Sequence, residues 1–273
     1  MNSFSTSSAP VRRNLAHAAR RHGLAAGVVA AGVLVVGLAG ASSAVLEPGT
    51  PAKDVTVGLD NDNAANPFIQ PPGVAARQDM DNTDVLFGRD NDDLLIGKLG
   101  DDTLLAGADD DILIGGPEKG TSPNSDVLVG DTGDDINIWA PGDGNDAVIG
   151  NEDKDTMIFA PFVENADGSL LLTRSYGRKI PHVSIDAKPT FSCTVVPVPE
   201  SQRLGAQFLV RFNVNGTPVV TVRQKDVEKV YCPSPQAGHA QVARLTGPHP
   251  TQFRTVALDR IGGTVGAILA PTA

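Results

Sequence analysis

Short apolar runs recur at regular intervals between residues 81 and 159, and each follows a polar turn rich in Gly, Asp and Asn. Four blocks repeat with a nine-residue period: DNTDVLFGR, DNDDLLIGK, LGDDTLLAG and ADDDILIGG. After an insertion the pattern resumes in SDVLVG, DTGDDINIWA, PGDGNDAVIG and NEDKDTMIFA. Three apolar residues after such a turn predict a short strand whose middle residue lies on one face.

The middle residue of each run is predicted to point inward. These residues are Leu86, Leu95, Leu104, Leu113, Leu128, Val148 and Met157, with Ile138 favoured over Asn137 through a one-residue slip. A six-residue turn and a three-residue strand bury too little surface to be stable alone. Two such units make one coil, and stacked coils bury a continuous apolar stripe. The pattern therefore predicts an all-β solenoid with parallel strands.

One aspartate precedes every apolar run in the same register: Asp84, Asp93, Asp102, Asp111, Asp126, Asp135, Asp146 and Asp155. Coils about 4.8 Å apart place Asp84 over Asp102 and Asp93 over Asp111. Two such carboxylates repel by roughly 1 kcal/mol in water and about 3–4 kcal/mol at an effective dielectric near 20. A divalent cation reverses that sign, and an oxygen-only ligand set favours Ca²⁺ over Mg²⁺, which needs stricter octahedral geometry.

The segment resembles the repeats-in-toxin (RTX, hemolysin-type) nonapeptide Gly-Gly-x-Gly-x-Asp-x-apolar-x over residues 81–159, most closely in IGKLGDDTLLAG and WAPGDGNDAVIG. This resemblance implies a calcium-binding parallel β-roll of the secreted bacterial type. Carried over by position, it implies that the eight register aspartates are calcium ligands. It further implies that turn backbone carbonyls complete the coordination, and the turn glycines of that set are Gly88, Gly97, Gly100, Gly115, Gly133 and Gly144.

Several turns depart from this pattern. Arg89 and Lys98 replace the second glycine and add positive charge beside the predicted cation sites, while Ala106 replaces the first glycine of another turn. We therefore expect fewer occupied sites than the six that alternate pairing would allow. The pairs Asp84/Asp102 and Asp93/Asp111 are the favoured ones.

Two rival interpretations fit the sequence less well, a disordered acidic tract and an EF-hand. A disordered acidic tract lacks regular apolar triplets, whereas this segment has them. Without calcium, however, we expect the segment to be disordered. An EF-hand is suggested by the Asp-Asn-Asp-Asn string at 60–63, but position six of that loop is not Gly and position twelve is not Glu.

The residues that flank each inward position are also apolar in several repeats, for example Val85 and Phe87, or Ile112 and Ile114. A monomer does not ordinarily expose an apolar sheet of that extent. The hypothesis is that another part of the chain, or a protein or cell-surface partner, covers at least one face of the roll.

Charge is distributed unevenly along the 273 residues, whose net charge is −10. Residues 79–155 hold 21 acidic and 4 basic side chains, whereas residues 160–273 hold 7 acidic and 12 basic ones. A strongly negative segment attracts cations and repels nucleic acid, whose binding depends on Lys and Arg. Nucleic-acid binding is therefore not expected.

Residues 1–44 have the pattern of a signal peptide, with Arg12, Arg13, Arg20 and Arg21 before the apolar run 24–40 and small residues at 41–44. An uncleaved membrane anchor is the alternative, although the run is shorter than the ~20 residues of a spanning helix. Both the Sec and the twin-arginine export routes are compatible with this segment. We expect a secreted protein, extracellular or associated with the cell wall, without a membrane span after processing.

The remaining chain is divided into three parts. Residues 45–80 are expected to be a Pro/Gly-rich linker, 160–235 a β-rich capping domain, and 236–273 a loosely ordered C-terminal tail. Asn215-Gly216 between alternating runs predicts a hairpin. The chain has two cysteines, Cys193 and Cys232, and their pairing is expected in an oxidising compartment, with two buried free thiols as the alternative.

The sequence thus favours a secreted protein that binds Ca²⁺ between stacked coils and folds on binding, with an affinity on the order of 10⁻⁴–10⁻³ M. A calcium-dependent adhesion or cell-wall-associated module is an alternative. An enzyme with the roll as an accessory is a weaker one, because neither His-Glu-x-x-His nor Gly-x-Ser-x-Gly is present. No catalytic residue is proposed.

Overall fold

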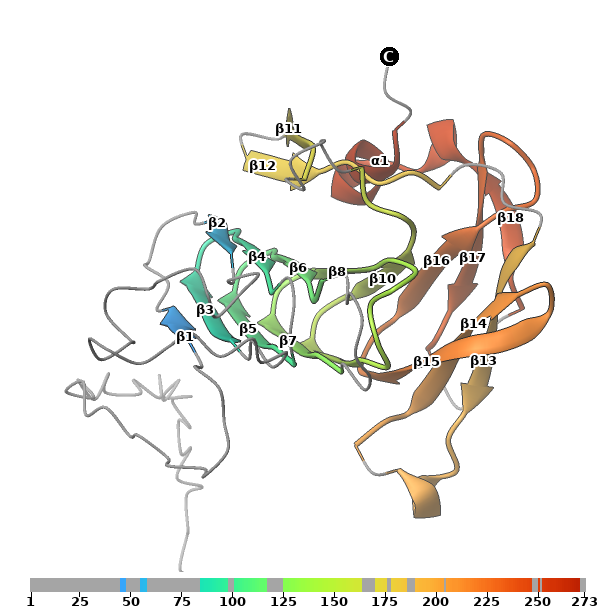
Figure 1. Ribbon diagram of the computed structural model, residues 1–273, viewed down its shortest axis with the longest axis horizontal. Helices are drawn as coiled ribbons and strands as arrows, with labels where there is room; N and C mark the ends of the chain where they lie inside the picture. The colour runs from blue at the N-terminus through green and yellow to red at the C-terminus, as the bar shows by residue number, and fades with distance from the viewer. Residues whose placement is uncertain are drawn as a thin grey trace, which may run out of the picture. The chain divides into compact units, whose positions relative to one another are not determined.

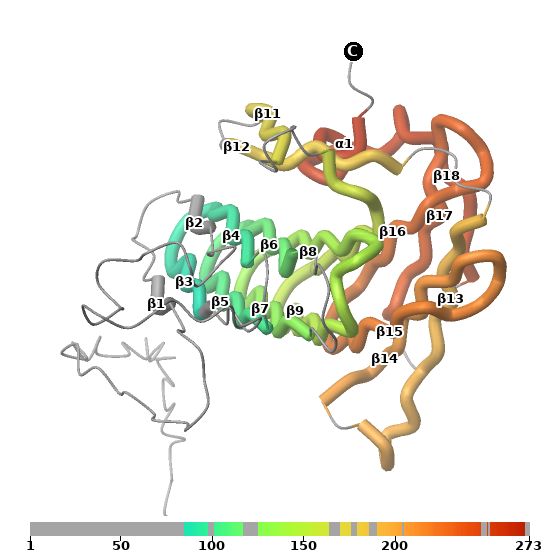
Figure 2. The backbone as a smooth tube through the Cα atoms, viewed as in Figure 1, coloured from blue at the N-terminus to red at the C-terminus, as the bar shows by residue number. Residues whose placement is uncertain are grey.

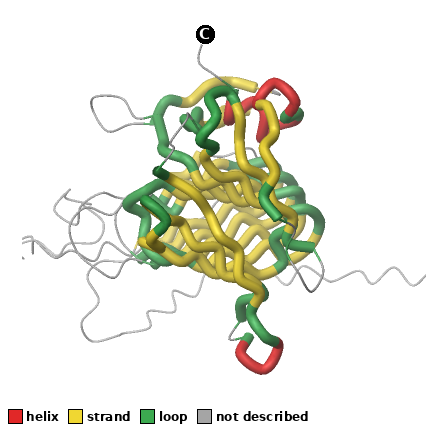
Figure 3. The backbone as a smooth tube through the Cα atoms, turned by 90° about the vertical axis from the view of Figure 1, so that its right-hand side faces the viewer, coloured by secondary structure: helices red, strands yellow, loops and turns green. Residues whose placement is uncertain are grey.

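A computed structural model describes residues 84–97, 101–116, 125–163, 170–175, 178–185, 190–203, 205–246, 250 and 252–270, with the backbone of 45–47 and 55–57 (Figure 1). The expected signal peptide at 1–44, Gly100 and the side chain of Asp84 lie outside the described residues. In the described part of the chain, strands make up most of the backbone, and the short helical segments lie at its edges (Figure 3).

The repeats form eight parallel strands that alternate between two sheets (Figure 2). The odd sheet contains β3 (Asp84–Asp90), β5 (Thr103–Ala108), β7 (Val127–Thr132) and β9 (Ala147–Glu152). The even sheet contains β4 (Leu94–Ile96), β6 (Ile112–Ile114), β8 (Ile136–Trp139) and β10 (Thr156–Phe159). This arrangement is a parallel β-solenoid, which confirms the all-β, β-roll fold class.

Two strands precede the repeats within the segment expected to be a linker. β1 (Val45–Glu47) pairs in parallel with β3, and β2 (Val55–Val57) pairs in parallel with β4. Both pairings extend the sheets of the roll by one strand. The linker expectation for 45–80 therefore differs from the structure at these two places.

The inward positions form two apolar ladders. Leu86, Leu104, Leu128 and Val148 are cross-strand partners in the odd sheet, and each is at most 2% exposed. In the even sheet Leu95, Leu113 and Met157 occupy the same place, as expected. Each strand thus buries its middle residue between the two sheets.

The slip that favoured Ile138 at the inward position is wrong. Asn137 pairs with Leu113 on one side and with Met157 on the other, so Asn137 points into the roll. The register is held at the start of the strand, where the backbone N–H of Asp111 donates to Oδ1 of Asp135 at 2.8 Å. A slip would break this bond and move Ile138 from the outer face of the sheet, where it is buried.

The outer face of the even sheet is covered by the chain itself. Ile112, Ile114, Ile136 and Ile138 belong to one buried cluster that also contains Ile180, Val183, Ile268 and Leu269. These covering residues come from β12 (Arg178–Pro181), the segment after it, and α1 (Gly263–Leu269), which lie above the even strands (Figure 1). β12 pairs with β11 (Leu172–Ser175). The apolar flanking residues of this sheet are therefore core residues.

The C-terminal tail was expected to be loosely ordered, and the structure differs. It contains β17 (His239–Arg244), β18 (Arg254–Ala257), the 3₁₀ turn η2 (Leu258–Arg260) and α1. β17 pairs with β16 (Lys229–Pro233) and with β18, so these strands continue the even sheet. The order has a physical reason, because this segment supplies apolar side chains to the cluster over the even sheet.

The last coil of the roll continues into the β-rich segment that follows it. β15 (Thr217–Lys225) pairs in parallel with β9, and β16 pairs in parallel with β10. β13 (Phe191–Pro197) and β14 (Phe208–Val214) extend the odd sheet beyond β15, with η1 (Glu200–Gln202) between them. Both roll sheets are thus extended by strands from outside the repeats.

Two local expectations for this segment are confirmed. Asn215 and Gly216 join β14 to β15 with φ values of 51° and 78°, which is the left-handed pair of a two-residue hairpin turn. Cys193 on β13 and Cys232 on β16 form a disulfide with a Cα–Cα distance of 6.3 Å. The disulfide links the odd sheet to the even sheet.

Candidate calcium sites

Two ladders of buried aspartates run along the roll, one at the start of each sheet's strands. The residues before the even strands are Asp93, Asp111, Asp135 and Asp155, and those before β5, β7 and β9 are Asp102, Asp126 and Asp146. All seven are at most 3% exposed. Asp84 begins β3 at the equivalent place, but its side chain lies outside the described residues. The structure thus brings the predicted ligands together in two rows.

Within each ladder, one carboxylate oxygen of an aspartate accepts a hydrogen bond from the backbone N–H of the aspartate one coil before it. The backbone N–H of Asp93 donates to Oδ1 of Asp111, and the same bond joins Asp111 to Asp135 and Asp135 to Asp155. In the other ladder Asp102 donates to Asp126, and Asp126 to Asp146. The distances lie between 2.6 and 3.0 Å. A backbone dipole therefore separates successive carboxylates, but their charges still accumulate along the row.

The second carboxylate oxygen folds back over its own turn, against the glycine that begins it. A methyl group on Gly97 would overlap Oδ2 of Asp102, and one on Gly115, Gly130 or Gly150 would overlap Oδ2 of Asp126, Asp135 or Asp155 in the same way. Only glycine leaves room for the carboxylate at this place. At these four turns the first glycine is thus required by packing against the aspartate, whereas Ala106 takes that place in the turn before Asp111.

A backbone carbonyl of the next coil shares that space. A methyl group on Gly97 would also overlap the carbonyl oxygen of Gly115, and one on Gly88 would meet both Oδ2 of Asp93 and the carbonyl oxygen of Ala106. A carboxylate oxygen and a carbonyl oxygen therefore lie side by side at successive turns. Calcium takes six to eight oxygen ligands of these two kinds.

The fit of the site to a cation is clearest at Asp155. Its side chain is fully buried, and no described residue donates a hydrogen bond to its Oδ2 atom. Burying an ionised carboxylate oxygen without a partner is strongly unfavourable, whereas a bound cation would compensate it. The oxygens present at this turn fit Ca²⁺.

The departures from the glycine pattern keep the backbone conformation of the repeat. Arg89, Asp131 and Asn151 at the second glycine position have φ values of 90°, 83° and 81°. At the third glycine position Asn91, Asp109 and Asp153 have φ values between 73° and 79°. Asn and Asp tolerate the left-handed region, while Arg does so at a higher cost. The side chain of Arg89 is exposed.

The glycines predicted as carbonyl ligands separate into groups. Gly88, Gly97 and Gly115 begin turns that hold a buried carboxylate. Gly133 instead packs against the carbonyl of Asp109. Gly144 accepts a hydrogen bond from Nε1 of Trp139 at 3.2 Å. Gly100 lies outside the described residues. Their role as ligands stays a prediction.

The turn before Asp146 is closed by side chains. Nε1 of Trp139 donates to the carbonyl of Asp143 at 2.7 Å, and the backbone N–H of Ala140 donates to Oδ2 of Asp143 at 2.8 Å. The Trp139 ring contacts Phe159 and Phe212 with centroid distances of 5.2 and 5.0 Å. This two-residue-longer turn is therefore fixed by its own hydrogen bonds.

Sequence reasoning missed a second row of aspartates, one residue before the buried ones. The backbone N–H of Ser125 donates to Oδ1 of Asp101, that of Asp134 to Asp110, and that of Lys154 to Asp134. The signal was the doubled Asp-Asp of four repeats. These exposed side chains cap the following coil.

Glu228 was also missed. The backbone N–H of Asp155 donates to Oε2 of Glu228 at 2.8 Å, so Glu228 holds the place that the next aspartate of the ladder would hold. It directly precedes β16, as each register aspartate precedes its own strand. Glu228 lies 73 residues from Asp155, and no repeat signature surrounds it, so the sequence offered no signal for it.

Burial raises the pKa of the carboxylates at the last coil. The pKa of Asp155 rises from 3.8 to about 8, mainly through desolvation, with further increases from the charges of Asp135, Glu228 and Asp134. Desolvation also raises the pKa of Asp146 to about 7 and raises that of Glu228. Burial thus favours the protonated form of Asp155 and Asp146 over that of an exposed aspartate.

Within the described residues, no three His, Cys, Asp or Glu side chains gather around one point. In the same part of the chain, no helix combines the length and apolar character needed to cross a bilayer.

Comparison with known families agrees with this geometry. Residues 83–118 match the family model of the RTX calcium-binding nonapeptide repeat, in four copies. A search of curated proteins finds no match for the chain. The matched segment contains β4 to β6 and the Asp93–Asp111 step, and the same strand register continues to β10. Residues 83–118 are thus similar to RTX calcium-binding nonapeptide repeats, and the structure folds them as part of a parallel β-roll.

Proposed function

We propose that this protein is secreted, binds calcium through the register aspartates of its roll, and completes its folding only when calcium is bound. The observation that carries the proposal is the geometry of the repeat turns that begin at Gly88, Gly97, Gly130 and Gly150. One oxygen of the aspartate bonds to the neighbouring coil, and the other lies beside a carbonyl of the next coil. These oxygens are hard ligands in a buried place, which suits calcium.

Electrostatics supports the coupling of folding to calcium. The ladders bury seven aspartates, which at neutral pH must either bind protons or repel one another. A divalent cation removes this cost in the folded chain and has no such site in the unfolded chain. Calcium is scarce inside cells and plentiful outside, so the roll would stay unfolded until export. The basic and apolar pattern of residues 1–44 supports export.

The test is far-UV circular dichroism of the purified protein during a calcium titration, with magnesium as the control. We expect a cooperative gain of β signal with calcium and none with magnesium at the same concentration. A spectrum that is fully folded in chelator and indifferent to calcium would contradict the proposal.

A calcium-dependent adhesion module is the second candidate. Val85, Phe87, Leu105, Val129 and Ile149 lie half-buried on the outer face of the odd sheet, where they form an apolar strip. Such a strip favours contact with a protein or cell-wall surface. Retention of the protein on cell walls in calcium and its release by chelator would support this function. Calcium binding without retention would leave only the first.

A further inference from the structure

The turn between β15 and β16 stacks on the last repeat turn. The inward residues Gln224 and Val230 pair with Val148 and Met157 of the last coil. The intervening residues Asp226 to Glu228 thus stand where the next repeat turn would stand. They belong to none of the repeats, and the connection is shorter than a repeat turn.

This turn provides the same two oxygens that a repeat turn provides. A methyl group on Gly150 would overlap both Oδ2 of Asp155 and the carbonyl oxygen of Asp226, as Gly97 would with Asp102 and Gly115. Oε2 of Glu228 accepts the backbone N–H of Asp155. A carbonyl and a carboxylate from outside the repeats therefore complete the geometry at Asp155.

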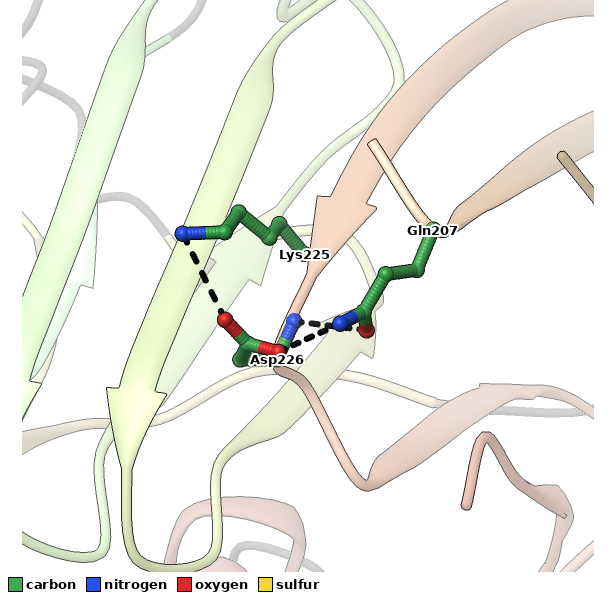
Figure 4. A network of polar contacts seen from close by, with 3 residues as sticks. All are labelled: Gln207, Lys225 and Asp226. Atoms are coloured by element: carbon green, nitrogen blue, oxygen red, sulfur yellow. Dashed lines mark hydrogen bonds and ion pairs between the residues drawn. The ribbon is translucent and has the colours of Figure 1, made fainter. Parts of the chain in front are cut away.

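The backbone of Asp226 is held in place by its neighbours. The Gln207 side chain donates to Oδ1 of Asp226 and accepts the Asp226 backbone N–H at 3.0 Å, while Nζ of Lys225 lies 3.5 Å from Oδ2 (Figure 4). Asp226 has a φ of 51°, a left-handed conformation that these contacts stabilise. The carboxylate of Asp226 thus contacts Gln207 and Lys225, while its backbone carbonyl faces Gly150.

A cavity of about 420 Å³ lies at this junction and is lined by Asp155, Thr156 and Glu228. Oδ2 of Asp155 is the buried oxygen that receives no hydrogen bond from any described residue. Lys154, Lys229 and Arg244 line the same cavity. Their charges lower the affinity for a divalent ion, although the ammonium of Lys229 lies over the Tyr231 ring at 5.9 Å.

We propose that Asp155, the carbonyl of Asp226 and Glu228 form a calcium site outside the repeats, which joins the roll to β16. The inference rests on the proposed function, because it extends the calcium ladder by one site. Calcium bound here would order the start of β16, the strand that carries Cys232. Because of the neighbouring cations, this site should be weaker than those within the repeats.

The decisive variant is Glu228→Gln, because the amide oxygen still accepts the Asp155 N–H while the negative charge is lost. We measure bound calcium per chain by equilibrium dialysis, and deuterium exchange of residues 225–231 with and without calcium. We expect the variant to bind one calcium fewer than the natural protein and to lose the calcium-induced protection of this segment. Glu152→Gln, the same change at an exposed glutamate one turn earlier, should change neither.

Lys154→Gln tests the site in the opposite direction. Removing this positive charge should tighten calcium binding at the junction by about two- to fivefold. A Glu228 that merely caps the Asp155 N–H would leave calcium binding unchanged in both variants, and that result overturns the inference. If Glu228→Gln does not fold in chelator, the Lys154→Gln titration decides alone. A natural protein that binds no calcium at all would instead overturn the proposed function.

Discussion

The backbone N–H of Asp93 donates to Oδ1 of Asp111 at 2.6 Å, across one full coil of the roll. This bond sets the register of the two strands that follow, because Leu94 then pairs with Ile112. The carboxylate that we propose as a calcium ligand thus also aligns the coils. One residue type at one position would then serve both register and metal binding.

Asp111→Asn separates these two roles. The amide oxygen can still accept the Asp93 N–H, so we expect the fold to form, but a charged ligand is lost. At calcium concentrations near 100 times the dissociation constant, one lost site removes up to about 2.7 kcal/mol of the free energy of unfolding. In chelator the variant should equal or exceed the natural protein in stability, since it buries one charge fewer. Urea unfolding in both conditions measures this.

Asp131→Asn is the matched control for that experiment. Asp131 is exposed and lies in a repeat turn with a φ of 83°, which Asn tolerates. We expect Asp131→Asn to match the natural protein in stability, both in calcium and in chelator. If it lost stability in calcium and gained it in chelator as much as Asp111→Asn does, the effect would come from net charge and not from the buried ladder.

Arg89→Gly should stabilise the roll. Arg89 has a φ of 90°, a region that glycine enters without steric cost, and its side chain is exposed. We expect a gain of about 1 kcal/mol in the free energy of unfolding in calcium. Arg89→Ala removes the charge but keeps the backbone strain, so it should give little gain. Equal gains in the two variants would assign the effect to charge.

Asn137→Leu should also stabilise the roll. Both polar atoms of the Asn137 amide are buried, and neither has a hydrogen-bond partner among the described residues. Leucine matches the inward neighbour Leu113, and we expect a gain of about 1–3 kcal/mol, measured by thermal unfolding. Asn213→Leu is the control, because the Asn213 amide donates to the carbonyl of Ser192. That variant should be destabilised, and a loss of stability in Asn137→Leu would show that the amide has a partner in solution.

The pH dependence of stability should largely disappear in calcium. In chelator, Asp155 and Asp146 have folded-state pKa values of about 8 and about 7, above the value of 3.8 for an exposed aspartate. The folded chain therefore binds more protons than the unfolded chain between pH 4 and 8, and stability falls as pH rises through this window. With saturating calcium the carboxylates stay ionised in the folded chain, so above about pH 5 neither the folded nor the unfolded chain binds protons at these groups, and stability should be nearly independent of pH there. Urea midpoints at several pH values measure both slopes, and parallel slopes would contradict this account.

The sequence alone determined the repeat and its chemistry. A period of nine with one aspartate in register leaves few folds that bury Leu86 and Leu104 together and stack Asp93 on Asp111. Those properties are local, since strand, turn and ligand all lie within one short block. The same logic applied to the Asn215-Gly216 hairpin, whose turn residues are adjacent in the chain.

Only the tertiary structure decided what lies against the repeats. Ile268 and Leu269 cover the even sheet, and no periodic pattern marks their segment, because a single covering layer needs apolar side chains but no repeat. Asn137 points inward although its side chain is polar. The hydrogen bond between Asp111 and Asp135 fixes the strand register, and its stabilisation outweighs the cost of burying one polar side chain. Glu228 reached Asp155 through the pairing of β16 with β10. Such contacts between distant residues depend on how separate segments pack together, and no single segment of the chain determines that packing.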